Sequence, residues 1–200
     1  EQERVADEMR MLRVRFEPRL ATLRFTQDHR IFQEQTAKDI VELLFSEHAM
    51  SERVEWRLQG SGPVREVCTQ YGETTLDFIH RILEEDGIFY FFEHRDEGDV
   101  LVLADSTSAY AAASAAELPF SAAAGMMGDQ AITSIAAVER LRPAKVTLVD
   151  HDFKRPTLDL TATAEATTAL GREHYDHPGR YLEPADGKRR AEALRDGLAT

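Results

Sequence analysis

The stretch that most constrains the fold is residues 64–105, which reads VREVCTQYGETTLDFIHRILEEDGIFYFFEHRDEGDVLVLAD. Thr74, followed three residues later by Asp77, is typical of a helix start, because both side chains can accept hydrogen bonds from free backbone N–H groups. Gly87 is typical of a helix end, since glycine adopts the left-handed backbone at little cost. We therefore predict a helix over residues 75–86, preceded by one strand and followed by two.

The predicted helix is amphipathic. At 100° per residue its large apolar side chains share one arc, joined by Leu76, and its charged side chains occupy the opposite arc. The helix should therefore bury one face and expose the other.

Residues 88–92 and 100–104 predict the strands of a hairpin, within residues 88–104, around a polar loop at 95–99 that contains a glycine. Neither strand alternates apolar with polar residues, so both of its faces are apolar. Each large apolar side chain contributes about 1.5–3 kcal/mol when fully buried, which makes this unit a nucleus of the core. The helix can cover only one side of the hairpin, so we expect a second sheet or a second copy of the chain on the other.

Ten side chains of this unit are assigned to the core or to assembly. The four on the helix and the six on the hairpin are Phe78, Ile79, Ile82, Leu83, Phe89, Tyr90, Phe91, Phe92, Leu101 and Leu103.

Before this unit, residues 11–16 and 20–25 are strand-like, with Pro18 as a turn. Thr36 and Asp39 repeat the capping pattern and predict a second amphipathic helix near residues 36–48. A strand at residues 54–58 follows. Residues 27–105 are thus expected to form an α+β lobe with two amphipathic helices.

After this unit, residues 106–130 are rich in alanine and serine and are interpreted as a crossing loop, with an alanine-driven helix over 109–117 as the alternative. Strands are predicted at 131–140, 144–153 and 158–164, as a meander in a second β-rich lobe over residues 131–183 that forms part of a small barrel. Residues 173–182 are expected to be irregular.

The last segment, residues 184–200, is predicted to be a connector helix. Its apolar stripe is narrow, consisting of Ala191, Leu194 and Leu198, and should therefore dock on another surface.

Composition excludes several classes of function. A chain of 200 residues can form one sizeable domain or two small ones without a metal or disulfide. Cys68 is the only cysteine, and a free cysteine in a strand-like run is more often a core residue than a catalytic thiol. The net charge of −12 argues against nucleic acid as a partner. No apolar run approaches the ~20 residues of a membrane helix, and the start does not resemble a Sec signal peptide, so we expect a soluble chain without a stable membrane anchor.

The acidic and histidine residues do not form a convincing catalytic pattern. Glu84, Glu85 and Asp86 could suggest the paired carboxylates of a glycosidase, but adjacent helical residues point about 100° apart, which favours a solvated face. His174 and His177 near Asp176 could bind a metal, but the following Pro178 and glycine disfavour the helix that this spacing would need. His48 on the second helix is interpreted as a cap or core residue. We assign no catalytic residue, cofactor or metal.

Several strings occur in an ordered set across nearly the whole chain. They are RIFQ at 30–33, CTQYGET at 68–74, DFI at 77–79, RILEEDGIFYFFEH at 81–94, LVLADS at 101–106, LPF at 118–120, DHDFKRP at 150–156 and YDHPGRY at 175–181. Together they resemble the VgrG family, the spike proteins of the bacterial type VI secretion system, which are related to the tail-hub proteins of contractile phages.

This resemblance implies an α+β, mainly β hub with two small β-barrel lobes per chain, of which residues 1–26 would supply strands of a truncated first barrel. It implies a homotrimer that forms a pseudo-sixfold ring and joins an Hcp-like secretion tube to a threefold needle. The OB-like domain and β-helical needle would lie outside this sequence and carry effectors or a tip protein. The spike would assemble in the bacterial cytoplasm and be ejected by type VI secretion. The chain would then be structural and not an enzyme. The alternatives are a hub of a contractile phage or phage-like particle and, more distantly, a cell-wall hydrolase domain.

Overall fold

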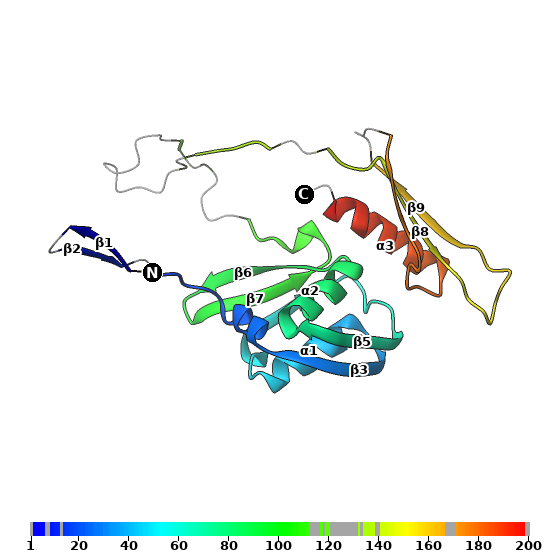
Figure 1. Cartoon of the computed structure of the whole chain (residues 1–200), viewed down its shortest axis with the longest axis horizontal. Helices are drawn as coiled ribbons and strands as arrows, with labels where there is room; N and C mark the ends of the chain where they lie inside the picture. The colour runs from blue at the N-terminus through cyan, green and yellow to red at the C-terminus, as the bar shows by residue number, and fades with distance from the viewer. Residues whose placement is uncertain are drawn as a thin grey trace.

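The computed structural model describes residues 2–6, 9–12, 14–112, 117, 119–120, 132, 134–138, 141–166 and 171–198. Within these ranges the chain has an α+β, mainly β fold of ten strands and three α-helices. Two lobes contain most of the helices and strands that the structure describes (Figure 1). We call residues 19–110 the first lobe, and residues 141–166 with 171–198 the second lobe.

The first lobe combines two sheets with two helices. Strand β3 (Gln27–Gln35) pairs antiparallel with β5 (Arg65–Thr74). In the other sheet β7 (Gly98–Ala104) lies between β4 (Val54–Arg57), which runs parallel to it, and β6 (Phe89–Arg95), which runs antiparallel. Helix α1 (Ala37–Glu47) and helix α2 (Thr75–Glu85) pack with both sheets around one apolar core.

Both helices begin at the predicted caps. The Thr36 hydroxyl accepts a hydrogen bond from the Asp39 backbone N–H at 3.1 Å, and the Asp39 carboxylate accepts one from the Thr36 N–H at 2.9 Å. The Thr74 hydroxyl accepts in the same way from the Asp77 N–H at 3.1 Å. Gly87 follows the end of α2 with φ +70°. The two predicted helices are confirmed, because the local capping signals agree with the apolar stripes.

The second lobe is a three-stranded sheet with one helix on it. Its central strand β8 (Lys145–Asp150) pairs antiparallel with β9 (Leu160–Glu165) and parallel with β10 (Glu173–Asp176). Helix α3 (Pro184–Gly197) packs on β8 and β9, with Ala191 fully buried (Figure 1). Of the predicted stripe, Ala191 and Leu194 pack on the second lobe itself, whereas Leu198 is 38% exposed.

Tyr181 is the largest side chain in the core of the second lobe. Its single O–H proton is shared between the backbone carbonyls of Leu148, at 2.9 Å, and Leu160. The ring leaves no room for a side chain at two neighbouring glycines, because a Cβ atom on Gly179 or Gly187 would overlap it. The packing of α3 against the sheet thus depends on glycine at position 187.

Three predictions in the N-terminal and hairpin regions need correction. Residues 20–25 were expected to be a strand but lie in a 3₁₀ helix, η1 (Arg19–Phe25), whose three-residue repeat directs Leu20 and Leu23 into the core. Residues 14–16 have no regular structure; the strand before them is β2 (Met9–Leu12), which pairs with β1 (Gln2–Ala6). The hairpin loop is tighter than 95–99, since Arg95 pairs with Gly98.

The second half of the chain contains further differences. Residues 134–138, within the strand predicted at 131–140, have no regular structure, and the remaining positions of that strand lie largely outside the described residues. Residues 173–176, expected to be irregular, form β10. Most of the crossing loop predicted at 106–130 also lies outside the described residues, although residues 107–109 form a 3₁₀ turn, η3 (Thr107–Ala109).

The predicted barrels do not close within the described part of the chain. β1 and β2 form a separate hairpin, and β8, β9 and β10 form an open sheet. Helix α3 covers one face of that sheet. Within the described ranges, this apolar face is therefore buried by a helix and not by further strands.

Candidate functional site

The ten residues assigned to core or assembly lie on α2 and on both faces of the β4–β7–β6 sheet. Six of them are buried in the core of the first lobe: Phe78, Ile79, Ile82, Leu83, Leu101 and Leu103. Tyr90 and Phe92, on the same sheet face as Leu101 and Leu103, are half-buried and pack against that core. Phe89 and Phe91 point to the opposite face, which we call the outer face.

A polar contact fixes the half-buried Tyr90 on the inner face. Its hydroxyl lies 3.0 Å from His80 Nε2, and the two rings stack with centroids 5.6 Å apart. Burial raises the pKa of Tyr90, which further favours the neutral phenol that can donate this hydrogen bond. The α2 helix therefore holds the hairpin by both apolar packing and a hydrogen bond.

The outer face is covered in part by the chain itself. Val102 and Ala104 on this face are fully buried. Tyr110 lies over the two phenylalanines, with ring centroids 5.4 Å from Phe89 and 4.8 Å from Phe91. The expectation that only a second sheet or second copy could cover this face was wrong for Val102 and Ala104. Phe89 and Phe91 remain half-buried, and Tyr110 is 53% exposed.

Charged side chains border this aromatic cluster of Phe89, Phe91 and Tyr110. Arg57 lies over the Phe91 ring, 6.0 Å from its centroid, and donates to Glu93 at 2.7 Å and to the Ala109 carbonyl at 2.8 Å. Arg95 bridges Glu93 and Glu55, at 2.5 and 2.6 Å. Hydrogen bonds from Arg57 and Arg95 lower the pKa of Glu93 to about 2. An apolar centre with a charged rim is the usual anatomy of a protein interface.

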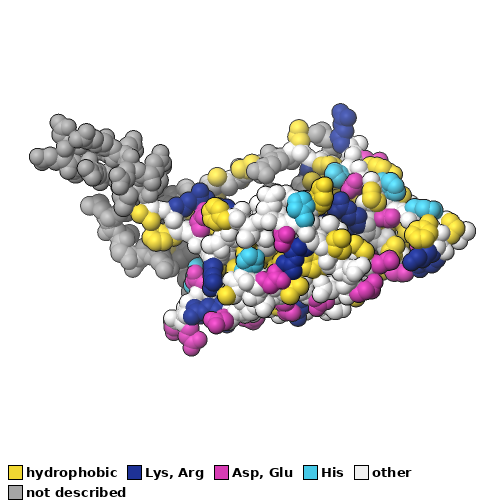
Figure 2. All heavy atoms as spheres, turned by 60° about the horizontal axis from the view of Figure 1, so that its bottom comes forward, with side chains coloured by type: hydrophobic (Ala, Val, Ile, Leu, Met, Phe, Trp, Pro, Cys, Tyr) yellow, Lys and Arg dark blue, Asp and Glu magenta, His cyan; other side chains and the backbone are white. Residues whose placement is uncertain are grey.

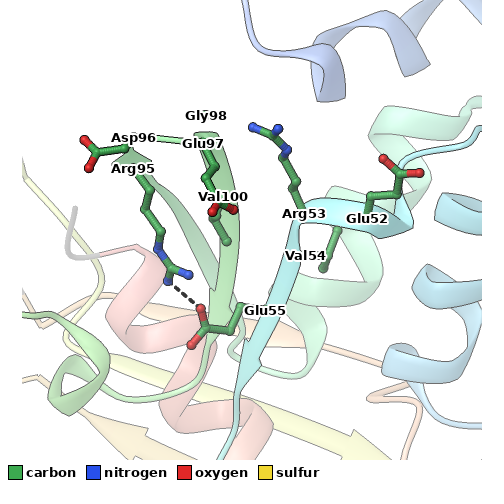
Figure 3. Close-up of a pocket in the computed structure, with 9 residues that line it drawn as sticks. All are labelled: Glu52, Arg53, Val54, Glu55, Arg95, Asp96, Glu97, Gly98 and Val100. Atoms are coloured by element: carbon green, nitrogen blue, oxygen red, sulfur yellow. Dashed lines mark hydrogen bonds and ion pairs between the residues drawn. The ribbon is translucent and has the colours of Figure 1, made fainter.

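A cavity of about 550 Å³ lies beside this rim, between the hairpin turn and the start of β4. Figure 3 shows the two segments facing each other across it, with the Arg95–Glu55 ion pair at its edge. Its lining is Glu52, Arg53, Val54, Glu55, Arg95, Asp96, Glu97, Gly98 and Val100. This lining contains no serine, cysteine or histidine, so it lacks a nucleophile–base pair of the Ser–His or Cys–His type.

The carboxylates considered for catalysis are placed differently from the prediction. Glu84 is exposed, as expected for a solvated face. The Asp86 side chain is instead buried, at 2% exposure, and the Glu85 side chain is half-buried, at 17%, among arginines of distant segments. The prediction that these two residues lie on a solvated helix face was wrong, because the end of α2 faces another part of the chain and not water.

The other residues considered for chemistry have structural surroundings. Cys68 is buried, and burial raises the pKa of its thiol, which disfavours a nucleophilic thiolate. His48 caps α1, with its backbone N–H bonded to Leu44. His177 Nδ1 donates to the Val149 carbonyl at 2.9 Å, while His174 lies on β10. Among the described residues no three His, Cys, Asp or Glu side chains gather as metal ligands.

On the face shown in Figure 2, acidic and basic side chains are interspersed and apolar side chains form small groups between them. No helix in the described ranges combines the length and the apolar character required to span a membrane.

Sequence reasoning missed three residues of the candidate site. Tyr110 and Arg57 complete the outer face, and Arg95 links its charged rim. None of them belongs to a motif of its own. The only available signal was the doubly apolar hairpin, which predicts that something must lie over Phe89 and Phe91 without identifying it.

Comparison with known proteins places this chain in a family. The model of the phage tail baseplate hub (GPD) family matches residues 1–198. Two spike proteins of the Pseudomonas aeruginosa type VI secretion system, VgrG1c and VgrG5, are 32% and 33% identical to the chain over 94% and 88% of its length. VgrG3 of Vibrio cholerae is 32% identical over 86% of the chain. The chain spans only 26%, 23% and 17% of the lengths of these three relatives.

Two solved structures show a partial likeness. A component of the type VI secretion system of E. coli, described as similar to tail proteins of bacteriophage T4, is 33% identical, with a TM-score of 0.45 over 48% of this chain and 27% of its own. A tail protein from Neisseria meningitidis is 14% identical, with a TM-score of 0.48 over 86% of this chain and 50% of its own. The family match over residues 1–198, together with the spike relatives, confirms the resemblance drawn from the ordered strings. The chain belongs to the phage tail baseplate hub family, and the relatives it matches include VgrG spike proteins of type VI secretion systems.

Proposed function

We propose that this chain is the structural hub portion of a VgrG-like type VI secretion spike. The observation that carries the proposal is the match of residues 1–198 to a tail hub family, combined with relatives that are type VI spikes. The first lobe supports it, because its buried and aromatic side chains are engaged in packing and its charged side chains in ion pairs. The chain would catalyse no reaction. The mechanical work of secretion would come from contraction of the sheath that surrounds the secretion tube.

The spike would be a homotrimer that adapts the symmetry of the secretion tube to that of the needle. The aromatic cluster of the outer face is the candidate assembly surface, since half-buried aromatic side chains with a charged rim are favoured at interfaces. The ten core and assembly residues keep this role as a prediction. Strands from other parts of the spike would complete the barrel lobes predicted at residues 1–26 and 131–183, with residues 27–105 as the α+β lobe between them.

The remaining partners follow from this role. An Hcp-like tube protein would bind one end of the ring, and effectors or a tip protein would ride on parts of the spike beyond this chain. The spike would be assembled in the bacterial cytoplasm and ejected through the secretion system to puncture a target membrane.

Secretion assays test this role in cells that make the complete protein. We expect the protein in the medium of cells with a functional contractile sheath and its retention in cells with a sheath that cannot contract. A second strain whose protein carries Phe91→Asp should lose secretion. Assembly would bury the new carboxylate in the aromatic cluster away from water, and this cost would prevent the spike from forming. Equal secretion with and without sheath contraction would contradict the proposal.

A hub of a contractile phage or phage-like particle is the second candidate. The description of the matching family, a phage tail baseplate hub, favours it. Electron microscopy with an antibody against the chain separates the two candidates, since a phage hub would be found in free particles with tails. A cell-wall hydrolase is the more distant alternative, and turnover of purified peptidoglycan by the chain would establish it.

A further inference from the structure

We infer that a buried ion cluster locks the second lobe in one orientation on the first, with Arg190 as the positioning residue. We call Arg65, Glu85, Asp86 and Arg190 the junction cluster. Arg65 comes from β5, Glu85 and Asp86 from the end of α2, and Arg190 from α3. This inference goes beyond the proposed hub role and does not depend on trimer formation.

The contacts within the cluster connect both lobes. Arg65 pairs with Asp86 at 2.7 Å and with Glu85. Arg190 Nη2 lies 3.7 Å from the nearest carboxylate oxygen of both Glu85 and Asp86. Arg190 also donates from Nη1 to the Gly179 carbonyl at 3.3 Å, which ties the guanidinium to its own lobe. A single side chain thus bonds to the second lobe while its charge faces the first.

A second layer of charges surrounds the cluster at its exposed side. Arg180 pairs with Glu85 at 3.0 Å, and Arg81 reaches Glu85 at 3.3 Å and Glu73 at 2.6 Å. An open groove of about 820 Å³ borders these residues. The strings at residues 81–94 and 175–181, which are far apart in the sequence, therefore meet through Glu85 and Arg180.

The backbone also brings the lobes close at this point. Gly87 has φ +70°, and a Cβ atom on it would lie 3.1 Å from the Cβ atom of Ala193 on α3. The same glycine ends α2 and leaves space for α3. Figure 1 shows α3 lying next to the end of the first lobe that contains α2.

Charge balance explains why each member matters. The four side chains of the junction cluster carry two positive and two negative charges. The side chains of Arg65, Asp86 and Arg190 are at most 10% exposed. Burial raises the pKa of Asp86 and lowers that of Arg190, because the charged forms are desolvated. Removing one partner of a buried pair leaves an uncompensated charge, whereas removing both can be nearly neutral.

The cluster is better suited to orient the lobes than to stabilise them strongly. Asp86 Oδ2 and the Nε atoms of Arg65 and Arg190 are buried without a hydrogen-bond partner among the described residues. Such unpaired atoms reduce the net gain from burial. Fixed charges nevertheless favour one arrangement, since sliding the lobes would separate Arg190 from both carboxylates.

Distance measurements between spin labels test the inference. Cysteines replace the exposed Glu42 on α1 and Lys188 on α3, in a chain that also carries Cys68→Ala, and the distance distribution is recorded by pulsed electron resonance. The parent should give one narrow peak. Arg190→Met, which keeps an unbranched side chain about as long as the arginine stem but removes the guanidinium, should broaden the distribution and lower the urea midpoint of unfolding. The control Arg189→Met, on the exposed face of the same helix, should leave both unchanged.

The double variant Asp86→Asn with Arg190→Met separates positioning from stability. It restores charge balance through Arg65 and Glu85, so its urea midpoint should recover relative to Arg190→Met, while its distance distribution should stay broad. It also keeps the test informative if Arg190→Met alone does not fold. A narrow parent-like peak in Arg190→Met or in the double variant would overturn the inference, whatever the oligomeric state of the protein.

Discussion

In the first lobe the buried core consists mostly of large side chains, with Phe45, Phe78 and Ile82 almost fully excluded from water, whereas three of the seven buried core residues of the second lobe are alanines. Each large apolar side chain contributes about 1.5–3 kcal/mol when buried, and an alanine much less. The first lobe can therefore rely on apolar burial. The second lobe depends on the Tyr181 hydrogen bonds, close helix packing and its contact with the first lobe.

The largest effect is expected from a cavity in the first lobe. Phe78→Ala removes a fully buried ring that stacks on Phe32 with centroids 5.5 Å apart, and it should lower the free energy of unfolding by about 3–5 kcal/mol. Urea denaturation measures the loss. Phe25→Ala, at a side chain that is 81% exposed, is the control and should change the free energy by about 0.5 kcal/mol or less. Similar losses at both positions would contradict the account of the core.

The second lobe should respond more to added volume than to lost volume. Gly187→Ala places a methyl group where it overlaps the Tyr181 ring, and we expect the free energy of unfolding to fall by about 1–3 kcal/mol. Gly197→Ala lies in the same helix with no neighbouring atom within 4 Å of the new methyl group, so it should be neutral or stabilising by up to about 1 kcal/mol. Thermal unfolding of both variants provides the comparison, and equal melting temperatures would show that α3 is not tightly packed.

Removing the Tyr181 hydroxyl should have an intermediate effect. Tyr181→Phe keeps the ring but removes the hydrogen bonds to the Leu148 and Leu160 carbonyls, with an expected loss of about 1–2 kcal/mol. Tyr175→Phe, at an exposed tyrosine on β10, is the matched control. If both variants unfold at the same urea concentration, the hydroxyl does not stabilise the second lobe.

The smallest effect concerns pH. The folded pKa of Glu93 is lowered from 4.5 to about 2 by hydrogen bonds from Arg57 and Arg95, so its contribution to stability is present above pH 4.5 and is lost as the pH falls toward 2. Glu93→Gln should therefore lower the melting temperature slightly at pH 6 and lose this difference near pH 2. A constant difference between the two proteins across this range would show that the ion pairs do not contribute.

The sequence was most informative where local and long-range signals agree. The caps at Thr36 and Thr74 and the doubly apolar hairpin predicted α1, α2, β6 and β7, because capping, periodicity and burial all favour the same structure. Strand β3 was not identified, since among its nine residues only Phe32 is buried. The strand predicted at residues 20–25 failed because Leu20 and Leu23 fit a three-residue repeat as well as an extended chain.

Contacts between distant segments could not be predicted in this way. β10 contains four residues and is defined by parallel pairing with β8, which leaves no local pattern. The burial of Glu85 and Asp86 depends on Arg65 and Arg190, which lie on other elements. Tyr110 covers the outer face from a segment whose composition indicated only a loop. The sequence therefore predicted which side chains of the central unit are buried better than it predicted what surrounds them.

The central claim is that this chain is a building block of a trimeric spike, and the mass of the complete protein in solution tests it most directly. Light scattering coupled to size-exclusion chromatography should give three copies per particle for the protein that contains this chain. A particle of one copy at concentrations where the protein is fully folded would contradict the account.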